Sequence, residues 1–481
     1  MVLGLALVAT ACGSTSKTQS TGRTAGTDSP ATDGAAGGSG APGASDAPTR
    51  SRSSGTIGAP AEEFPPAPIV AGGGPVRLGV GVTANSIKIG FHFSAPLGPA
   101  FAIVGFGGTP EGENNERVII DALVKHYNSH GGLAGRKILP VYNEYEAASG
   151  ESWEVLAAQA CEKFVNDEKV FAVASGHVGF NDALSNCLAK GKTPLMQQQQ
   201  WPYDTKYIKD YSPYLYQPSR MRPERWVPAY IKGLKDAGYF TKGYKLGLMR
   251  YDSPVFTRIA SMMRNELKKL GLVLTSEAVI GAPHSVGDFG AMSSEISSAT
   301  LQFRGAGITH VIYDEWAGQL PFFGITIADQ QNFHPRYGFT SVNLTNTQAQ
   351  QHSAENLHGS VVVSWLPGQD VAKPDDPRKG GALERCLAII RAAGVTTNRL
   401  YDGTHCDSLF FLEAVLKKTN NITPEGLKAT SEKLGSSYDS PYTFATKFAS
   451  GRPDGASAVR IGRYVDGCTC YRYTSGDRPV G

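Results

Sequence analysis

Apolar and polar residues alternate in short blocks along residues 86–189, and their spacing predicts strands separated by helices. Residues 86–93 alternate apolar and polar side chains, which is typical of a strand. Residues 114–129 instead repeat apolar side chains at helical spacing, with Ile119, Leu123 and Tyr127 on one face. The same two periods predict strands at 137–142 and 169–174 and helices at 151–166 and 182–189. Strands that alternate with helices indicate a parallel sheet covered by helices on both faces.

The strand-and-helix pattern starts again after a polar, aromatic stretch at residues 203–218. It predicts helices at 224–237, 255–270, 289–304 and 319–330 and strands at 245–249, 272–279, 310–314 and 337–341. Two successive blocks of this kind predict an α/β protein with two doubly wound lobes. Because ligands bind beyond the carboxyl ends of strands in open α/β sheets, we expect a binding cleft between the lobes.

An apolar run at the start of the chain ends at Cys12. Small residues, Ala9 and Ala11, precede this cysteine and Gly13 follows it, as at the end of a secretory signal. The pattern resembles a bacterial lipobox, in which the cysteine becomes the lipidated first residue; a short buried core segment is the alternative. Since the run is far shorter than the ~20 apolar residues that cross a bilayer, we expect a lipid anchor on the outer face of the bacterial cell membrane.

The segment after Cys12 is rich in Ser, Thr, Gly, Ala and Pro, with few large apolar side chains before Phe64. Such a composition buries too little surface to offset the entropy of ordering, so we expect a flexible tether. The expected division is a signal peptide at residues 1–11, a lipid-anchored tether at 12–76 and a two-lobe ligand-binding region at 77–481.

Six of the seven cysteines follow Cys12. An even number in an exported protein favours disulfides over metal or thiol chemistry. We expect Cys161 to pair with Cys187 and Cys386 with Cys406, because each pair falls on two sequential helical segments. For Cys468 and Cys470 the sequence leaves three alternatives: a small ring, bonds to other partners, or free thiols.

Composition and motifs argue against several functions. The formal net charge is +3 with mixed signs throughout, which gives no basic stripe for nucleic acid. We find no G-x-S-x-G, P-loop, H-E-x-x-H or C-x-x-C motif in the sequence. The run His405-Cys406-Asp407 resembles a nucleophile cluster, but consecutive residues do not share a helix face. We therefore predict no enzyme activity, no cofactor and no metal site.

Three segments resemble the type I periplasmic binding proteins, in the branch that includes the leucine/isoleucine/valine-binding proteins of ABC importers. The most specific is YNSHGGLAGRKI at residues 127–138; the others are IKIGFHFSAPLG at 87–98 and NDEKVFAVASGH at 166–177. Residues 401–418 resemble a late helix of the family. The resemblance covers about residues 86–473.

The resemblance implies a hinge with three crossings between two doubly wound parallel-sheet lobes. The expected crossings lie near Gln217-Pro218, residues 361–364 and residues 441–444. Lobe one would then combine about 86–216 with 365–438, and lobe two about 218–361 with 441–473. Three short crossings permit hinge closure around a ligand.

The resemblance also implies a set of ligand-binding residues at strand ends. They are Ser94, Ser175, Gly176, His177, Gln198, Gln200, Tyr251, Asp252, Asp314, Glu315, Trp316 and Asn343. Simpler roles remain open for some of them: Tyr251 and Trp316 as packing aromatics, Asp252 as a helix N-cap, and His177 as the partner of a loop carbonyl.

Two departures from the family bear on the ligand. Long amides at residues 197–200 stand where branched-chain binders carry small Ala and Thr. Where the family usually places an acid against the ligand's ammonium group, this chain has Ser341 or Asn343, with Asp314 or Glu315 as substitutes. Both departures count against a branched-chain amino acid, and an amide, a urea-like solute, an aromatic compound or a short peptide is as plausible.

We therefore expect a monomeric, extracytoplasmic solute-binding lipoprotein. It would capture a small polar ligand, such as an amino acid or an amide, and deliver it to an ABC permease, with the membrane contacted through lipid on Cys12. The alternatives are a ligand-binding sensor of the same fold, a secreted enzyme and a structural envelope protein.

Overall fold

The computed structural model describes residues 75–95, 116–176, 181–198, 201–396 and 402–481. Five parallel strands form the smaller of its two main sheets, in the order β3-β2-β4-β5-β6. The strands are β2 (Ser86–Ser94), β3 (Lys137–Tyr145), β4 (Ala172–Ser175), β5 (Leu195–Met196) and β6 (Leu215–Tyr216). β4 begins three residues later than the pattern predicts, because Lys169 has a left-handed φ of 51° that turns the chain first.

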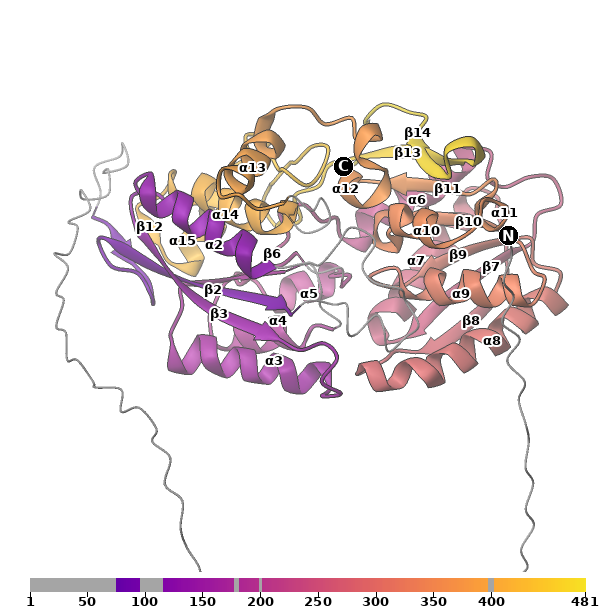
Figure 1. Ribbon diagram of the computed structural model, residues 1–481, viewed down its shortest axis with the longest axis horizontal. Coiled ribbons are helices and arrows are strands. Elements are labelled where there is room, and N and C mark those ends of the chain that lie inside the picture. The colour runs from indigo at the N-terminus through magenta and orange to yellow at the C-terminus, as the bar shows by residue number, and fades with distance from the viewer. Residues whose placement is uncertain (1–74, 96–115, 177–180, 199–200, 397–401) are drawn as a thin grey trace, which may run out of the picture. The chain divides into compact units, whose positions relative to one another are not determined.

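Helices cover both faces of the smaller sheet (Figure 1). One face carries α2 (Glu116–Ser129), α13 (Gly381–Ala392) and α14 (Asp402–Leu416), whose apolar residues share one core with β2. The other carries α3 (Trp153–Glu162), which continues into a π-helical turn at Lys163–Asp167, and α4 (Ala183–Lys190). α5 (Thr205–Asp210) shares the core of α3 and α4, whereas α15 (Pro424–Ser431) packs on α14. β1 (Arg77–Leu78) pairs with β12 (Asn421–Ile422).

The larger sheet has the order β14-β13-β11-β10-β9-β7-β8, with β15 paired to β13. The parallel strands are β7 (Leu246–Asp252), β8 (Leu274–Gly281), β9 (His310–Asp314), β10 (Arg336–Thr340) and β11 (Val361–Ser364). The antiparallel strands are β13 (Ala458–Val465), β14 (Cys470–Tyr473) and β15 (Arg478–Pro479). The α/β fold with parallel lobes is therefore confirmed, and the larger sheet gains an antiparallel edge that the pattern did not predict.

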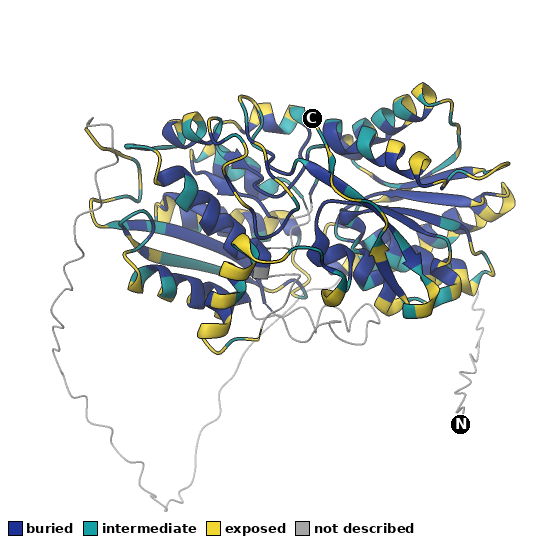
Figure 2. Cartoon of the chain, turned by 90° about the horizontal axis from the view of Figure 1, so that it is seen from above, coloured by how far each residue is buried: buried dark blue, intermediate teal, exposed yellow. Residues whose placement is uncertain are grey.

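Helices cover the larger sheet, and the longer ones each bury an apolar face. The helices are α6 (Pro223–Asp236), α7 (Pro254–Lys269), α8 (Phe289–Gly305), α9 (Gln319–Gln330), α10 (Thr345–Gln351), α11 (Ala354–Leu357) and α12 (Pro367–Asp370). In α7, Phe256, Ile259, Ala260, Met263 and Leu267 are buried at the three- and four-residue spacing of a helix face. Figure 2 shows the result: the strands are mostly buried, and exposed residues gather on the outward faces of the helices.

The first expected crossing lies beside residues 453–455, which follow the third expected crossing at 441–444. Gln217 forms a bridge with Asp454, and the backbone N–H of Gly455 donates to the Gln217 carbonyl at 2.8 Å. A Cβ at Gly455 would lie 2.0 Å from the carbonyl oxygen of Pro218, so only glycine permits this approach. The second crossing comes later than the sequence indicates: residues 361–364 form β11, and α12 still packs on β11 and α10.

Three arginines surround the fully buried Asp454 beside the first crossing. Its carboxylate accepts hydrogen bonds from the backbone N–H of Arg222 (3.1 Å) and from Nη1 of Arg225. Burial lowers the pKa of Arg452 to about 10; the charges of Arg225 and Arg222 add to this shift and Asp454 opposes it. Asp454 is therefore the acid that balances several cations at this point.

Both disulfides expected from the sequence are present in the structure, Cys161–Cys187 and Cys386–Cys406. The first joins α3 to α4 and the second joins α13 to α14. Cys468 and Cys470 also form a disulfide, which closes the small ring that was one of three alternatives.

Removing the Cys386–Cys406 bond by a double alanine substitution is expected to lower the free energy of unfolding by about 3 kcal/mol, since the bond closes a 20-residue loop and constrains the unfolded chain. Urea denaturation monitored by circular dichroism measures the loss. The matched control removes the Cys468–Cys470 bond, which spans a separation of only 2 residues and should change stability much less. Equal losses in the two variants would contradict the prediction.

Candidate functional site

Polar residues end neighbouring parallel strands in both sheets. Ser94 and Ser175 are the last residues of β2 and β4, and the register pairs Ser175 with His92, so both serines lie at one edge of the smaller sheet. Asp252 and Asp314 end β7 and β9 in the larger sheet, where the register pairs Asp314 with Arg250. These edges are the positions at which open α/β sheets bind ligands.

An aromatic cluster joins the two edges, and the sequence analysis found only part of it. Tyr251 ends β7 with Asp252, Phe256 lies in the first turn of α7, and Trp316 follows β9. Trp201 follows β5 from the smaller sheet, and its ring lies 5.1 Å from that of Trp316 and 5.4 Å from that of Phe256. Trp316 stacks on Phe256 at 5.6 Å and contacts Tyr251 at 4.3 Å.

Trp201 and Trp316 each carry a buried polar atom in the indole ring. Both side chains are buried, and neither indole Nε1–H has a hydrogen-bond acceptor among the described residues. By contrast, the Tyr251 hydroxyl donates to Oε1 of Gln319 at 2.9 Å. Because a buried donor without an acceptor costs free energy, the cluster is incomplete as a purely structural contact.

Polar contacts outside the cluster also join elements of the two sheets. Arg258 of α7 forms an ion pair with Asp204, which caps α5. The backbone N–H of Trp153 donates to the carbonyl of His284 at 2.8 Å, and the His284 ring contacts the Glu154 carboxylate at 3.0 Å. The two edges therefore face each other with contacts between them.

Glu315 and Asn343 are engaged in local structure. The Glu315 carboxylate accepts hydrogen bonds from the backbone N–H groups of Gly318 and Gln319 at 3.1 Å each, at the start of α9. Asn343 Nδ2 donates to the same carboxylate at 2.6 Å. Burial raises the pKa of Glu315 to about 8 despite these donors, so it is mostly uncharged near pH 7.

Ser341 and Asp370 form a second local contact. Ser341 Oγ donates to Oδ2 of Asp370 at 2.8 Å and accepts the backbone N–H of Trp365 at 2.7 Å. Burial raises the pKa of Asp370 to about 7. Asp314 is also buried, and burial raises its pKa well above the usual range. None of these groups offers a ready full negative charge to a ligand ammonium group.

The buried carboxyl groups predict a pH dependence of stability. Because their native pKa values of about 8 (Glu315) and about 7 (Asp370) exceed those of the unfolded chain, the native state holds more protons between about pH 4 and pH 8. The free energy of unfolding should therefore fall as pH rises through this window, by about 1.4 kcal/mol per pH unit for each carboxyl that keeps its proton. Denaturation at fixed pH values should show a shallower fall for Glu315→Gln, and identical slopes would contradict the assignment.

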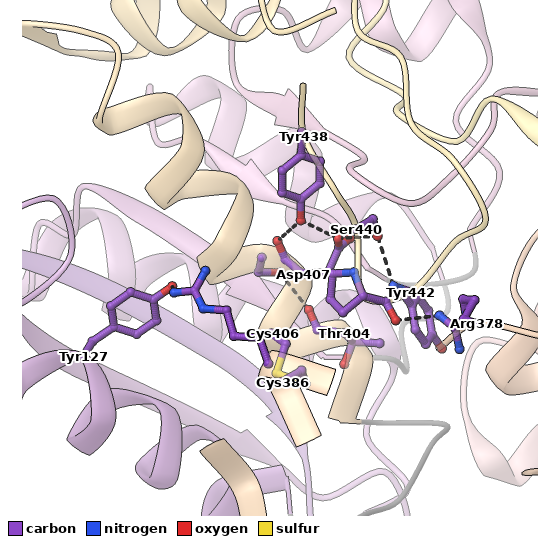
Figure 3. The surroundings of a disulfide bond; sticks show 12 residues. Tyr127, Arg378, Cys386, Thr404, Cys406, Asp407, Tyr438, Ser440 and Tyr442 are labelled. Carbon is purple, nitrogen blue, oxygen red and sulfur yellow. Dashed lines mark hydrogen bonds between the residues drawn. A yellow bond between two sulfur atoms is a disulfide. The ribbon is translucent and has the colours of Figure 1, made fainter. Parts of the chain in front are cut away.

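Gln198 is tied into the smaller sheet's core and not open at the cleft. Its Nε2 donates to Oδ2 of Asp407 at 2.7 Å, and its Oε1 accepts from Ser219 at 2.9 Å. Figure 3 shows Tyr438 and Ser440 turned toward the same Asp407, whose Oδ1 accepts from each hydroxyl at 2.6 Å. Burial raises the pKa of Asp407.

Ser94 meets a buried pair that the sequence analysis missed. Ser94 Oγ donates to Oε1 of Glu116 at 3.3 Å, and His405 Nε2 lies 2.5 Å from Oε2 of the same carboxylate. A Cβ at Gly176 would lie 2.3 Å from Oε2 of Glu116, so a larger residue there would displace this carboxylate. Ser175 Oγ donates to the Met196 carbonyl at 3.3 Å. Ser94 contacts Glu116 and not His405, so the three side chains do not have the arrangement of a nucleophile with its base.

The remaining predicted residues separate into two groups. Asp252 is exposed, and the N-cap of α7 is Ser253, so Asp252 does not cap this helix. Cys12, His177 and Gln200 lie outside the described residues.

Across the described ranges, no group of three or more His, Cys, Asp or Glu side chains is placed to hold a metal ion. No helix in those same ranges has the length and apolar content needed to cross a bilayer.

Comparison with known proteins supports the resemblance found in the sequence. A family model described as periplasmic binding protein matches residues 107–467. No curated protein matches the chain. Among solved structures, an ABC transporter substrate-binding protein from Aeropyrum pernix is 13% identical, with a TM-score of 0.60 over 82% of this chain and 96% of that chain.

Two further structures carry ligands. A branched-chain amino acid ABC transporter protein from Thermus thermophilus with bound valine is 15% identical, with a TM-score of 0.59 over 82% of this chain and 97% of that chain. A solute-binding protein of an ABC transporter from R. palustris, in complex with 4-hydroxybenzoate, is 13% identical, with a TM-score of 0.57 over 82% of this chain and 97% of that chain. At these identities the likeness establishes the fold, and the family match extends over most of the chain. The chain belongs to the type I periplasmic binding protein family, extracytoplasmic proteins that bind small molecules such as amino acids or aromatic compounds for ABC transporters.

Proposed function

We propose that this protein captures a small, flat solute carrying a hydrogen-bond acceptor, such as an amide or an aromatic acid, and delivers it to an ABC importer. The observation that carries the proposal is the contact of Trp201 with Trp316 across the strand ends, with both indole N–H groups buried and without acceptors among the described residues. A ligand packed against these rings would accept hydrogen bonds from their indole N–H groups.

The charges near the strand ends favour such a ligand over a free amino acid. An α-ammonium group needs an ionised carboxylate beside it. Glu315 has a pKa of about 8 and is engaged by three donors, while burial raises the pKa of Asp314 well above its usual range. An uncharged or anionic solute does not require these carboxyl groups to ionise.

A thermal-shift panel on the full chain tests the ligand class. The panel contains amides, urea, aromatic acids, amino acids and short peptides. A ligand at about a hundred times its dissociation constant should add ~2.7 kcal/mol of stability, which gives a clear rise in the melting temperature. We expect amides or aromatic acids to give this rise.

Variants then locate the binding site. Trp201→Ala should abolish the ligand-induced rise, whereas Phe240→Ala should keep it. Phe240 packs on Tyr239, whose hydroxyl bonds the Val311 and Arg336 carbonyls at the opposite edge of the larger sheet. A rise with amino acids alone, or a rise that survives in Trp201→Ala, would contradict the proposal.

We further propose that the protein is a monomer anchored to the outer face of the cell membrane by lipid on Cys12. The support is the apolar run and small residues before this cysteine and the Ser-, Gly- and Pro-rich segment after it. Cells that express the full chain and are fed an alkyne-labelled fatty acid should incorporate the label, and Cys12→Ser should remove it. Label retained in the Cys12→Ser variant would contradict the anchor.

A further inference from the structure

A cavity of about 210 Å³ lies outside the aromatic cluster, between α13 and the segments before α13 and around Tyr442. Its charged lining consists of Lys373, Asp376, Arg378, Lys379, Glu384 and Arg391. The volume is enough for several water molecules or one small organic molecule. Four cations and two anions give this lining a formal excess of positive charge.

The two acids are already paired with the two arginines. Arg378 Nη2 lies 2.8 Å from the Asp376 carboxylate, and Arg391 forms an ion pair with Glu384. Lys373 and Lys379 are exposed and form no ion pair with any described residue. The cavity therefore keeps two ammonium groups that an added anion can neutralise.

Neighbouring acidic residues do not neutralise the ammonium groups of Lys373 and Lys379. Asp375 pairs with Arg472 at 3.2 Å. Asp439 accepts the backbone N–H of Ala382 at 2.8 Å, at the start of α13, where the helix dipole favours an anion. Both carboxylates are thus engaged by other groups.

The rest of the lining is apolar and held in place. Leu383 and Leu387 stand four residues apart on one face of α13, and the Tyr442 ring forms another part of the wall. The Cys386–Cys406 disulfide joins α13 to α14, and Figure 3 shows Arg378 beside Tyr442, where its Nη1 donates to the Pro441 carbonyl at 2.5 Å. A ligand would therefore bind in a cavity whose walls are already in place.

We propose that this cavity binds a small organic carboxylate, with the carboxylate group at Lys373 and Lys379 and the apolar body against Leu383 and Leu387. The site is separate from the proposed solute site at Trp201 and Trp316, so it does not depend on that proposal.

Fluorine NMR of the full chain titrated with 4,4,4-trifluorobutanoate tests the site. The uncharged amide of the same acid is the ligand control. The site variant is Lys373→Gln/Lys379→Gln, and the matched variant is Lys268→Gln/Lys269→Gln, which removes the same charge from exposed positions at the end of α7. Trp201→Ala reports on the solute site.

We expect the acid to bind and the site variant to weaken it about tenfold, the combined effect of two exposed charge interactions. The matched variant and Trp201→Ala should bind the acid with the affinity of the original protein. The amide should bind more weakly than the acid, and added salt should lower the affinity for the acid. The proposal is overturned if the acid does not bind at millimolar concentration, if the site variant binds it unchanged, or if only Trp201→Ala loses it.

Discussion

Replacing Trp316 by alanine is expected to lower the free energy of unfolding by about 3–5 kcal/mol, the range for removing a large aromatic side chain from a core. Trp316 is fully buried and contacts the rings of Tyr251, Phe256 and Trp201. Its loss would leave a cavity at the carboxyl edge of the larger sheet and remove one wall of the proposed solute site. Urea denaturation measures the stability, and the thermal-shift panel measures the loss of the ligand response.

Trp316→Phe separates packing from hydrogen bonding. Phenylalanine keeps a ring that can stack on Phe256, so we expect it to recover most of the stability lost in Trp316→Ala. It has no indole N–H, so the ligand response should stay weak. Full ligand response in Trp316→Phe would mean that this N–H does not contact the ligand, and a stability loss below about 1 kcal/mol in Trp316→Ala would contradict the packing argument.

Replacing Asp454 by alanine is expected to cost about 3–5 kcal/mol, because it leaves buried cations without their acid. Asp454 is fully buried and pairs with Arg225, which is itself buried. Arg222 Nε also lies 4.0 Å from the Asp454 carboxylate, and the charge of Asp454 acts on the pKa of Arg452. Since Asp454 also forms a bridge with Gln217, its loss should affect the contact between the first crossing and residues 453–455.

Two controls isolate the buried charge. Asp236→Ala removes an aspartate that pairs with Lys232 and Arg478 in partly exposed positions, and should cost about 0–1 kcal/mol. The double variant Arg225→Met/Asp454→Leu removes both partners and should lose less than Asp454→Ala alone. A double variant that loses more than the single one would show that the acid stabilises the fold by some route other than balancing charge.

Local periodicity was sufficient to predict most of the parallel strands and the helices between them. The strand at residues 310–314 and the helix at 319–330 coincide with β9 and α9, because an apolar run and a helical repeat are set by neighbours in the sequence. β13 is different. It pairs antiparallel with β11, almost a hundred residues earlier, and nothing in its own pattern indicates that partner.

The site was harder to predict because its side chains form hydrogen bonds with residues far away in the sequence. Strand ends pointed to Trp316 and Tyr251, which lie in the aromatic cluster. Gln198, however, is bound by Asp407, 209 residues away, and the Glu116–His405 contact spans 289 residues. A list of residues at strand ends cannot show which polar groups are already satisfied by the core, and it gave no reason to single out Trp201.

The pairing of β11 between β10 and β13 has a consequence for how the chain acquires its structure. β13 ends at residue 465, so the larger sheet lacks a strand until nearly the whole chain is present. The helical layer on the smaller sheet is also completed late, because α2 packs on α13 and α14 and β1 pairs with β12. Contacts this distant in sequence form late and slowly. A chain threaded through an export channel from its N-terminus would thus remain open through most of its passage, and both lobes would close only after the last strands had crossed.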